Sequence, residues 1–123
     1  MDDAPSQIYR RVIDRLAHDT LHGQGQTASA AIRRGVWNPH VATETHPDVG
    51  INELLARLSD QDRAILAEMV AESFRSGVHQ TLVTLHEEAI IPFDRGYEGT
   101  PFHDYIGRVN GWEWPQSPDA RRW

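Results

Sequence analysis

The sequence predicts an all-α protein, a small helical bundle built on one long helix. Apolar residues recur every three or four positions over most of the chain, which is the spacing of one face of a helix. Few segments alternate with the period of two that is typical of strands. A chain of 123 residues is long enough to bury a core of its own, so it needs neither a metal nor a disulfide, and cysteine is absent.

The first predicted helix covers about residues 6–22. Its apolar side chains fall on one side at ~100° per residue. Asp3 or Ser6 is expected to cap its start, because short polar side chains accept the free amide protons there. Gly23 is expected to end it.

The segment from Gly23 to Gly50 shows a weaker pattern. A short helix is expected over residues 28–34, and turns are expected around Pro39 and Pro47, since proline keeps its predecessor out of the helical region. A long loop inside a compact domain needs anchors. We expect Trp37 and Val41 to be buried and to hold it.

The strongest pattern lies between Ile51 and Ala89. A short amphipathic helix is predicted over residues 51–58, and Ser59 with Asp62 resembles a capping box for a second helix. The second helix carries a stripe that crosses Gly77 without losing phase. We predict one helix of roughly 30 residues, kinked near Gly77 and ended by Pro92. Its apolar stripe consists of Leu66, Val70, Phe74, Val78, Leu82, Leu85 and Ala89.

The length of this helix leads to two alternatives. At ~1.5 Å per residue it would be about 45 Å long, which is more than a compact monomer of this size needs. Either a break at Gly77 folds it into a hairpin, or it packs against a second copy of the chain.

The C-terminal part is predicted to be rich in loops and aromatic residues. Residues 92–100 form a loop by composition, and Thr100 followed by Pro101 is a typical helix start. The helix should end at Asn110-Gly111. We expect one helical domain over residues 1–115 and a polar tail over residues 116–123.

The composition excludes several kinds of chemistry. All 12 basic residues are arginine, so a Schiff-base lysine and a P-loop lysine are absent, and the lack of cysteine excludes thiolate chemistry. The net charge of −6 opposes nucleic-acid binding. No apolar run approaches the length of a membrane span, and the first residues lack a secretory signal. We therefore expect a cytoplasmic protein.

Seven histidines raise the question of a metal site. His79 and His86 lie two helical turns apart, about 10.5 Å along the axis, so one zinc ion cannot bind both rings through bonds of ~2.0–2.1 Å. They are expected to make separate contacts beside the stripe, with Glu87 adjoining. We predict no metal ligands and no cofactor.

His103 and Asp104 lie at the start of the last predicted helix. Adjacent residues on a helix point ~100° apart, so these two cannot form a catalytic dyad with each other. The helix dipole alone favours an acid at Asp104. Trp112 and Trp114 are candidates for partner binding, and Trp114 before Pro115 suggests a plug that seats the chain against the long helix.

Several segments together resemble a small bacterial family of helical proteins of unknown function, over roughly residues 50–115. They are residues 54–59, Gly77-Val78-His79-Gln80-Thr81-Leu82, Gly99-Thr100-Pro101-Phe102-His103-Asp104 and Trp114-Pro115. The resemblance implies a compact helical protein and no particular activity.

Our leading hypothesis is a non-enzymatic protein-interaction module that binds a second copy of itself or binds and neutralises a partner protein. The alternative is a small-molecule or metal site, such as that of a hydrolase. We assign no catalytic residue. The candidate binding residues are His79, His86, Glu87, His103, Asp104, Trp112 and Trp114.

Overall fold

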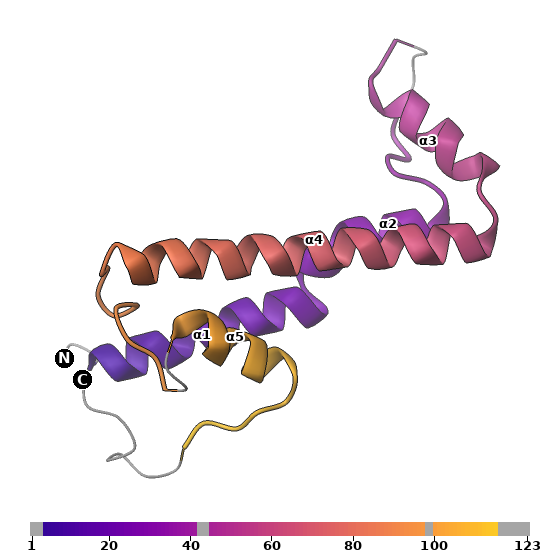
Figure 1. Ribbon diagram of the computed structural model, residues 1–123. Helices are drawn as coiled ribbons and strands as arrows, with labels where there is room; N and C mark the ends of the chain where they lie inside the picture. The colour runs from indigo at the N-terminus through magenta and orange to yellow at the C-terminus, as the bar shows by residue number, and fades with distance from the viewer. Residues whose placement is uncertain (1–3, 42–44, 98–99, 116–123) are drawn as a thin grey trace.

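The computed structural model describes residues 4–41, 45–97 and 100–115, and within these ranges the regular structure is helical (Figure 1). The predicted all-α class is confirmed. The predicted tail over residues 116–123 lies outside the described residues. In chain order the helices are α1 (Pro5–His22), the 3₁₀ turn η1 (Gln24–Gln26), α2 (Thr27–Arg34), α3 (Asp48–Arg57), α4 (Asp60–Glu87) and α5 (Pro101–Val109).

Helix α4 is the axis of the molecule. It contains 28 residues and is about 42 Å long at 1.5 Å per residue. Helix α2 lies along its N-terminal half, α1 and α5 pack beside its C-terminal half, and α3 lies at its N-terminal end (Figure 1). None of the helices in the described ranges has both the length and the apolar character that crossing a membrane requires.

The long bent helix predicted across Gly77 is present as α4. Every residue from Asp60 to Glu87 is helical, so the alternative of a hairpin at Gly77 is excluded. The helix was expected to extend to Pro92, but it ends at Glu87. The reason is local, because Ala89 takes the left-handed conformation with φ of 55° and turns the chain away.

The start of α1 differs from the prediction. Ala4 is the N-cap residue, and its amide donates to Gln7 Oε1 at 3.3 Å, while Ser6 lies inside the first turn. Pro5 explains this position, since proline favours the first place of a helix, where no amide proton is needed. Asp3 lies outside the described residues. Gly23 ends the helix as predicted.

The other predicted caps are confirmed. Ser59 Oγ accepts the Asp62 amide at 3.1 Å at the start of α4. Thr100 Oγ1 accepts the His103 amide at 3.4 Å at the start of α5, which Asn110 caps at its other end.

Two separate hydrophobic clusters lie along α4. The first joins α1, α4, α5 and the segment before α5, and its buried members are Tyr9, Ile13, Ala17, Leu82, Tyr97, Tyr105 and Val109. The second joins α2, α3 and the first half of α4 through the buried side chains of Ile32, Leu55 and Ala67. Trp37 packs on this second cluster and is half-buried, as is Val41, so the loop is less deeply anchored than expected.

The apolar stripe of α4 is only partly covered. Leu82 is 1% exposed, whereas Val70, Phe74 and Val78 are half-buried and Ala89 is exposed. Different helices cover different halves: α2 packs near Ala67, while α1 and α5 pack near Leu82. The stripe is therefore left incompletely covered where the two sets of helices meet.

Candidate functional site

Three of the predicted site residues gather around one aromatic ring. Ring centroids of His79, His86 and His103 lie 5.0, 6.1 and 4.9 Å from that of Phe102. His79 and His86 reach the ring from α4, and His103 adjoins it on α5. His79 and His86 were predicted to make separate contacts, but both rings lie against the same phenyl ring.

Two of these imidazoles are held by local contacts. His86 Nδ1 lies 3.2 Å from the Phe93 carbonyl oxygen, and His103 Nδ1 lies 2.5 Å from Thr100 Oγ1. Glu87 is exposed at the end of α4. Within the described part of the chain, no three His, Asp or Glu side chains have an arrangement suited to a metal ion.

Asp104 lies in the core and not on the surface with the histidines. It is 0% exposed, its Oδ2 accepts the Tyr9 hydroxyl at 2.5 Å, and the same oxygen accepts the Tyr97 amide at 2.6 Å. Gly96 packs so closely that a Cβ there would lie 2.8 Å from Oδ2. Burial, reinforced by the hydrogen bond to Asp104, raises the pKa of Tyr9 far above its ordinary value.

A second buried hydroxyl pair joins α1 to α5. Tyr105 Oη lies 2.6 Å from Thr20 Oγ1, and the Thr20 hydroxyl also lies 2.8 Å from the Leu16 carbonyl oxygen. Burial raises the pKa of Tyr105. Together with Asp104, this pair fixes α5 on α1. Asp104 therefore has a structural role in the packing, which its position at the helix start did not reveal.

Trp114 acts as a plug, but against α1 and not against the long helix as predicted. Its indole Nε1 donates to Asp14 Oδ1 at 2.9 Å, and its ring meets Tyr9 edge-on at 6.0 Å between centroids. Trp112 meets Trp114 edge-on, with ring centroids 5.1 Å apart. The polar partner Asp14 on α1 explains the direction, because the half-buried indole N–H finds its acceptor there.

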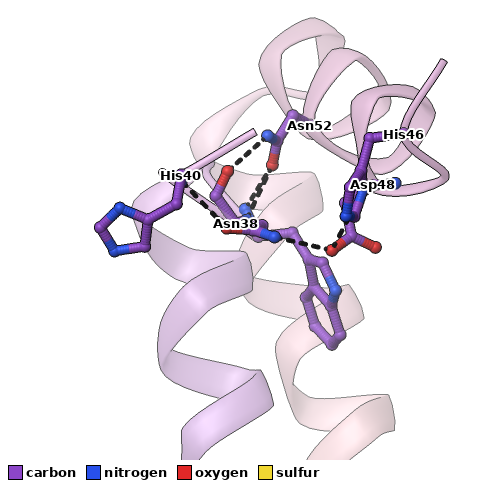
Figure 2. Close-up of polar contacts among 6 residues, drawn as sticks. Asn38, His40, His46, Asp48 and Asn52 are labelled. Atoms are coloured by element: carbon purple, nitrogen blue, oxygen red, sulfur yellow. Dashed lines mark hydrogen bonds and ion pairs between the residues drawn. The ribbon is translucent and has the colours of Figure 1, made fainter. Parts of the chain in front are cut away.

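A polar clasp holds the loop after α2 against α3 (Figure 2). Asn52 Oδ1 accepts the amides of Trp37 at 2.7 Å and Asn38 at 3.0 Å, and its Nδ2 donates to the Asn38 carbonyl at 2.8 Å. Asn38 Nδ2 donates to Asp48 Oδ2 at 2.9 Å, and the Asp48 amide donates to His46 Nδ1 at 3.0 Å. No local spacing in the sequence marks Asn52 as a partner of the loop, so the sequence alone does not predict this clasp.

A groove runs along α4. One part, of about 550 Å³, lies between α4 and Val12 and Leu16 of α1, and Phe93 closes one side. The next part, of about 490 Å³, lies between α4 and α2, near Ala28 and Trp37. Ser73 and Phe74 line both parts, so the groove follows α4 past the junction of the two clusters.

The groove is lined without a charged side chain. Between Met69 and Thr84 the charged residues of α4 are Glu72 and Arg75, whose charged groups lie 3.6 Å apart. Both residues lie about 140–160° around the helix axis from Gly77. We call the opposite side the neutral face of α4. It consists of Met69, Val70, Ser73, Phe74, Ser76, Gly77, Gln80, Thr81 and Thr84.

Three of the four hydroxyl groups of the neutral face are bonded within the helix. Ser73, Thr81 and Thr84 each donate to the carbonyl four residues earlier, at 3.1, 2.8 and 3.2 Å. A surface whose donors are bonded internally loses little hydrogen bonding when water leaves it. The groove can therefore bind an apolar group, and its lining offers no acid or base for catalysis.

Fold and site together define a small all-α protein with an uncharged groove on its central helix. The model of a family of unknown function, DUF6547, matches residues 2–116, and the chain belongs to this family. No curated protein and no solved structure matches it.

Proposed function

We propose that this protein is a non-enzymatic protein-interaction module and that the neutral face of α4 is its binding surface. The observation that carries the proposal is the uncharged groove, in which an apolar stripe of the sequence stays half-covered. Solvent-facing sides of helices are normally charged or strongly polar. A face that is neutral over four turns fits contact with another protein better than contact with water.

The shape of the groove supports a helical segment as the bound element. From Val70 to Leu85 the lining residues of α4 extend over about 22 Å, at 1.5 Å per residue. Amphipathic helices bind such grooves with residues spaced three or four apart. Phe74 lies in the middle of the groove, where an aromatic side chain has the most contact area to offer.

The charge distribution favours a protein over a nucleic acid. A nucleic acid would require a basic patch, whereas the chain carries −6 overall and the groove is neutral. A strongly basic protein partner would require acidic side chains at the site, and Glu72 lies on the other side of α4. The bacterial origin and the cytoplasmic location stay predictions from the sequence.

Photo-cross-linking in cells tests the proposal. A photoreactive amino acid replaces Ser73 or Gln80, which are both exposed on the neutral face. The matched control carries it at Glu72, which is exposed on the charged side of the same helix. We expect one adduct of defined mass from the first two variants and none from the control.

The partner is then identified by mass spectrometry, and a third variant tests the face itself. Gly77→Arg adds a charge to the neutral face, and we expect the fold to tolerate the change, because Gly77 is exposed and a Cβ there meets nothing within 4 Å. Loss of the adduct in this variant supports the proposal. Equal labelling at Glu72 and Ser73, or no adduct at Ser73, contradicts it.

A further inference from the structure

We infer that His18 and His22, at the C-terminal end of α1, form a site that binds one divalent transition-metal ion, copper(II) most tightly. This inference goes beyond the proposed function, because the two histidines lie on another side of α1 from Val12 and Leu16, which line the groove. It also departs from the sequence-based expectation of no metal ligands. The spacing and geometry of the two rings carry it, together with the charges around them.

The two histidines lie one helical turn apart on the same side of α1. Four residues correspond to about 400° around the helix axis and about 6 Å along it, so both side chains leave the helix in nearly the same direction. Their ring centroids lie 5.5 Å apart, with 55° between the ring planes. Zinc-binding helices place two histidines at this same spacing. The helix therefore presents both rings to one point in the solvent.

The distance between the rings matches the distance that one bound ion requires. A metal–nitrogen bond of ~2.0–2.1 Å places the ion about 3.2 Å from each ring centroid, because the bonding nitrogen lies about 1.1 Å from the centre of its ring. With the tetrahedral angle of about 109° at the ion, the two centroids then lie about 5.2 Å apart. The observed 5.5 Å is close to this value, so small side-chain rotations bring both rings to one ion.

Both imidazoles have ring nitrogens available for a ligand. His18 and His22 are exposed, and within the described ranges neither ring forms a hydrogen bond or an ion pair with the protein. By contrast, the Nδ1 atoms of His46, His86 and His103 each lie within hydrogen-bond distance of another protein atom. An ion can therefore reach the pair on α1 without breaking a contact of the fold.

The charges around the pair favour a cation. His22 lies in the last turn of α1, where the helix dipole presents its negative end. Arg15 Nε lies 3.2 Å from Asp19 Oδ2, so this carboxylate balances the charge of the arginine nearest in sequence. Arg11 lies seven residues before His18, about 10.5 Å along the axis. The chain as a whole carries −6, which attracts cations to its surface.

The two nitrogen ligands determine the kind of ion. Imidazole nitrogen suits copper, zinc and nickel, whereas magnesium and calcium prefer oxygen ligands. For the same ligands, the affinity of these divalent ions is highest for copper(II). Two protein ligands leave the other coordination positions to water, so a donor atom from another molecule can bind the same ion.

Titration calorimetry with copper(II) and with zinc(II) tests the site on the full chain, prepared without a histidine tag. The unaltered chain should bind one ion at this site, and His18→Gln and His22→Gln should each weaken that binding at least tenfold. His40→Gln is the matched control, since His40 is exposed and lies outside the pair, and it should leave the affinity unchanged. Circular dichroism checks that each variant keeps its helix content. Unchanged affinity in His18→Gln and His22→Gln overturns the inference.

A double variant tests the spacing at a constant number of histidines. Arg15→His combined with His18→Gln places two histidines seven residues apart, about 10.5 Å along the axis, which one ion cannot bridge. It also removes a positive charge, so general attraction of cations to the surface would strengthen binding. We expect binding at least tenfold weaker than in the unaltered chain. Equal or tighter binding overturns the inference.

Paramagnetic broadening of NMR signals by copper(II) locates the ion in the unaltered chain and needs no substitution. The ring signals of His18 and His22 should broaden at a fraction of one equivalent of copper, before those of the other histidines. Broadening that spreads equally over all seven histidines overturns the inference. Neither result affects the proposed function, because its cross-linking positions, Ser73 and Gln80, lie on α4.

Discussion

Replacing Tyr9 by phenylalanine removes one oxygen atom from the core and should destabilise the protein substantially. The hydroxyl donates to the buried Asp104 carboxyl at 2.5 Å, and Tyr9 is 0% exposed. A hydrogen bond to a charged group contributes about 1.5–3 kcal/mol, and water cannot replace the lost donor at a fully buried oxygen. The phenylalanine ring keeps the contacts with Phe93, Tyr97 and Trp114, so the expected loss is about 1.5–3 kcal/mol from the hydrogen bond alone.

Urea denaturation of a double-mutant cycle measures this contribution. The cycle comprises Tyr9→Phe, Asp104→Asn and the double variant, and the coupling free energy should be about 1.5 kcal/mol or more. Tyr97→Phe is the control, because its hydroxyl accepts Arg10 Nε at the longer distance of 3.2 Å in a part-buried position, so its loss should cost less than the loss of the Tyr9 hydroxyl. A coupling free energy below about 0.5 kcal/mol would refute the view that this pair fixes α5 on α1.

Three further changes probe other parts of the structure. Because burial raises the pKa of both Tyr9 and Tyr105, the unfolded chain binds fewer protons than the native chain above pH ~10, so the free energy of unfolding should fall as the pH rises, by at most about 1.4 kcal/mol per pH unit for each group. Urea midpoints at rising alkaline pH measure this slope, which Tyr9→Phe should reduce. Gly96→Ala should lower the free energy of unfolding by about 1–3 kcal/mol, since the added Cβ would lie 2.6 Å from the Thr100 carbonyl carbon. Gly50→Ala should be neutral or stabilising. Thermal denaturation that finds Gly96→Ala the more stable of the two contradicts this packing. Asn52→Ala should speed up hydrogen exchange of the Trp37 and Asn38 amides, whereas Glu53→Ala, a change at an exposed neighbour, should not. Unchanged exchange of the two amides in Asn52→Ala would show that the clasp does not hold the loop.

The sequence predicted most of the fold because the deciding signals are local. The stripe through Phe74 and Leu82 predicted α4, and Thr100-Pro101 predicted the start of α5. The end of α4 was misplaced because Pro92 is a strong signal, whereas the left-handed turn at Ala89 carries no signal in its residue type. Alanine seldom adopts that conformation, so nothing local could have indicated it.

The site could be predicted only in part, since it depends on contacts between distant residues. The sequence points to His79, His86 and His103 but not to their common neighbour Phe102. Phe102 lies on α5, whereas His79 and His86 lie on α4, so no spacing connects them. The partner of Asp104 is Tyr9, which lies 95 positions away. One signal was available: Ser73, Gly77 and Thr81 recur every four residues, which marks a neutral strip along a predicted helix.

The two hydrophobic clusters share no buried residue, and α4 is the element that contributes to both. Loosening of α2 and α3 would leave Tyr9, Asp104 and Tyr105 in place at the opposite end. Each end of the protein can then open at a free energy of its own, below that of complete unfolding. Because α4 joins the two clusters, opening at one end would remove one wall of the groove in the middle of α4.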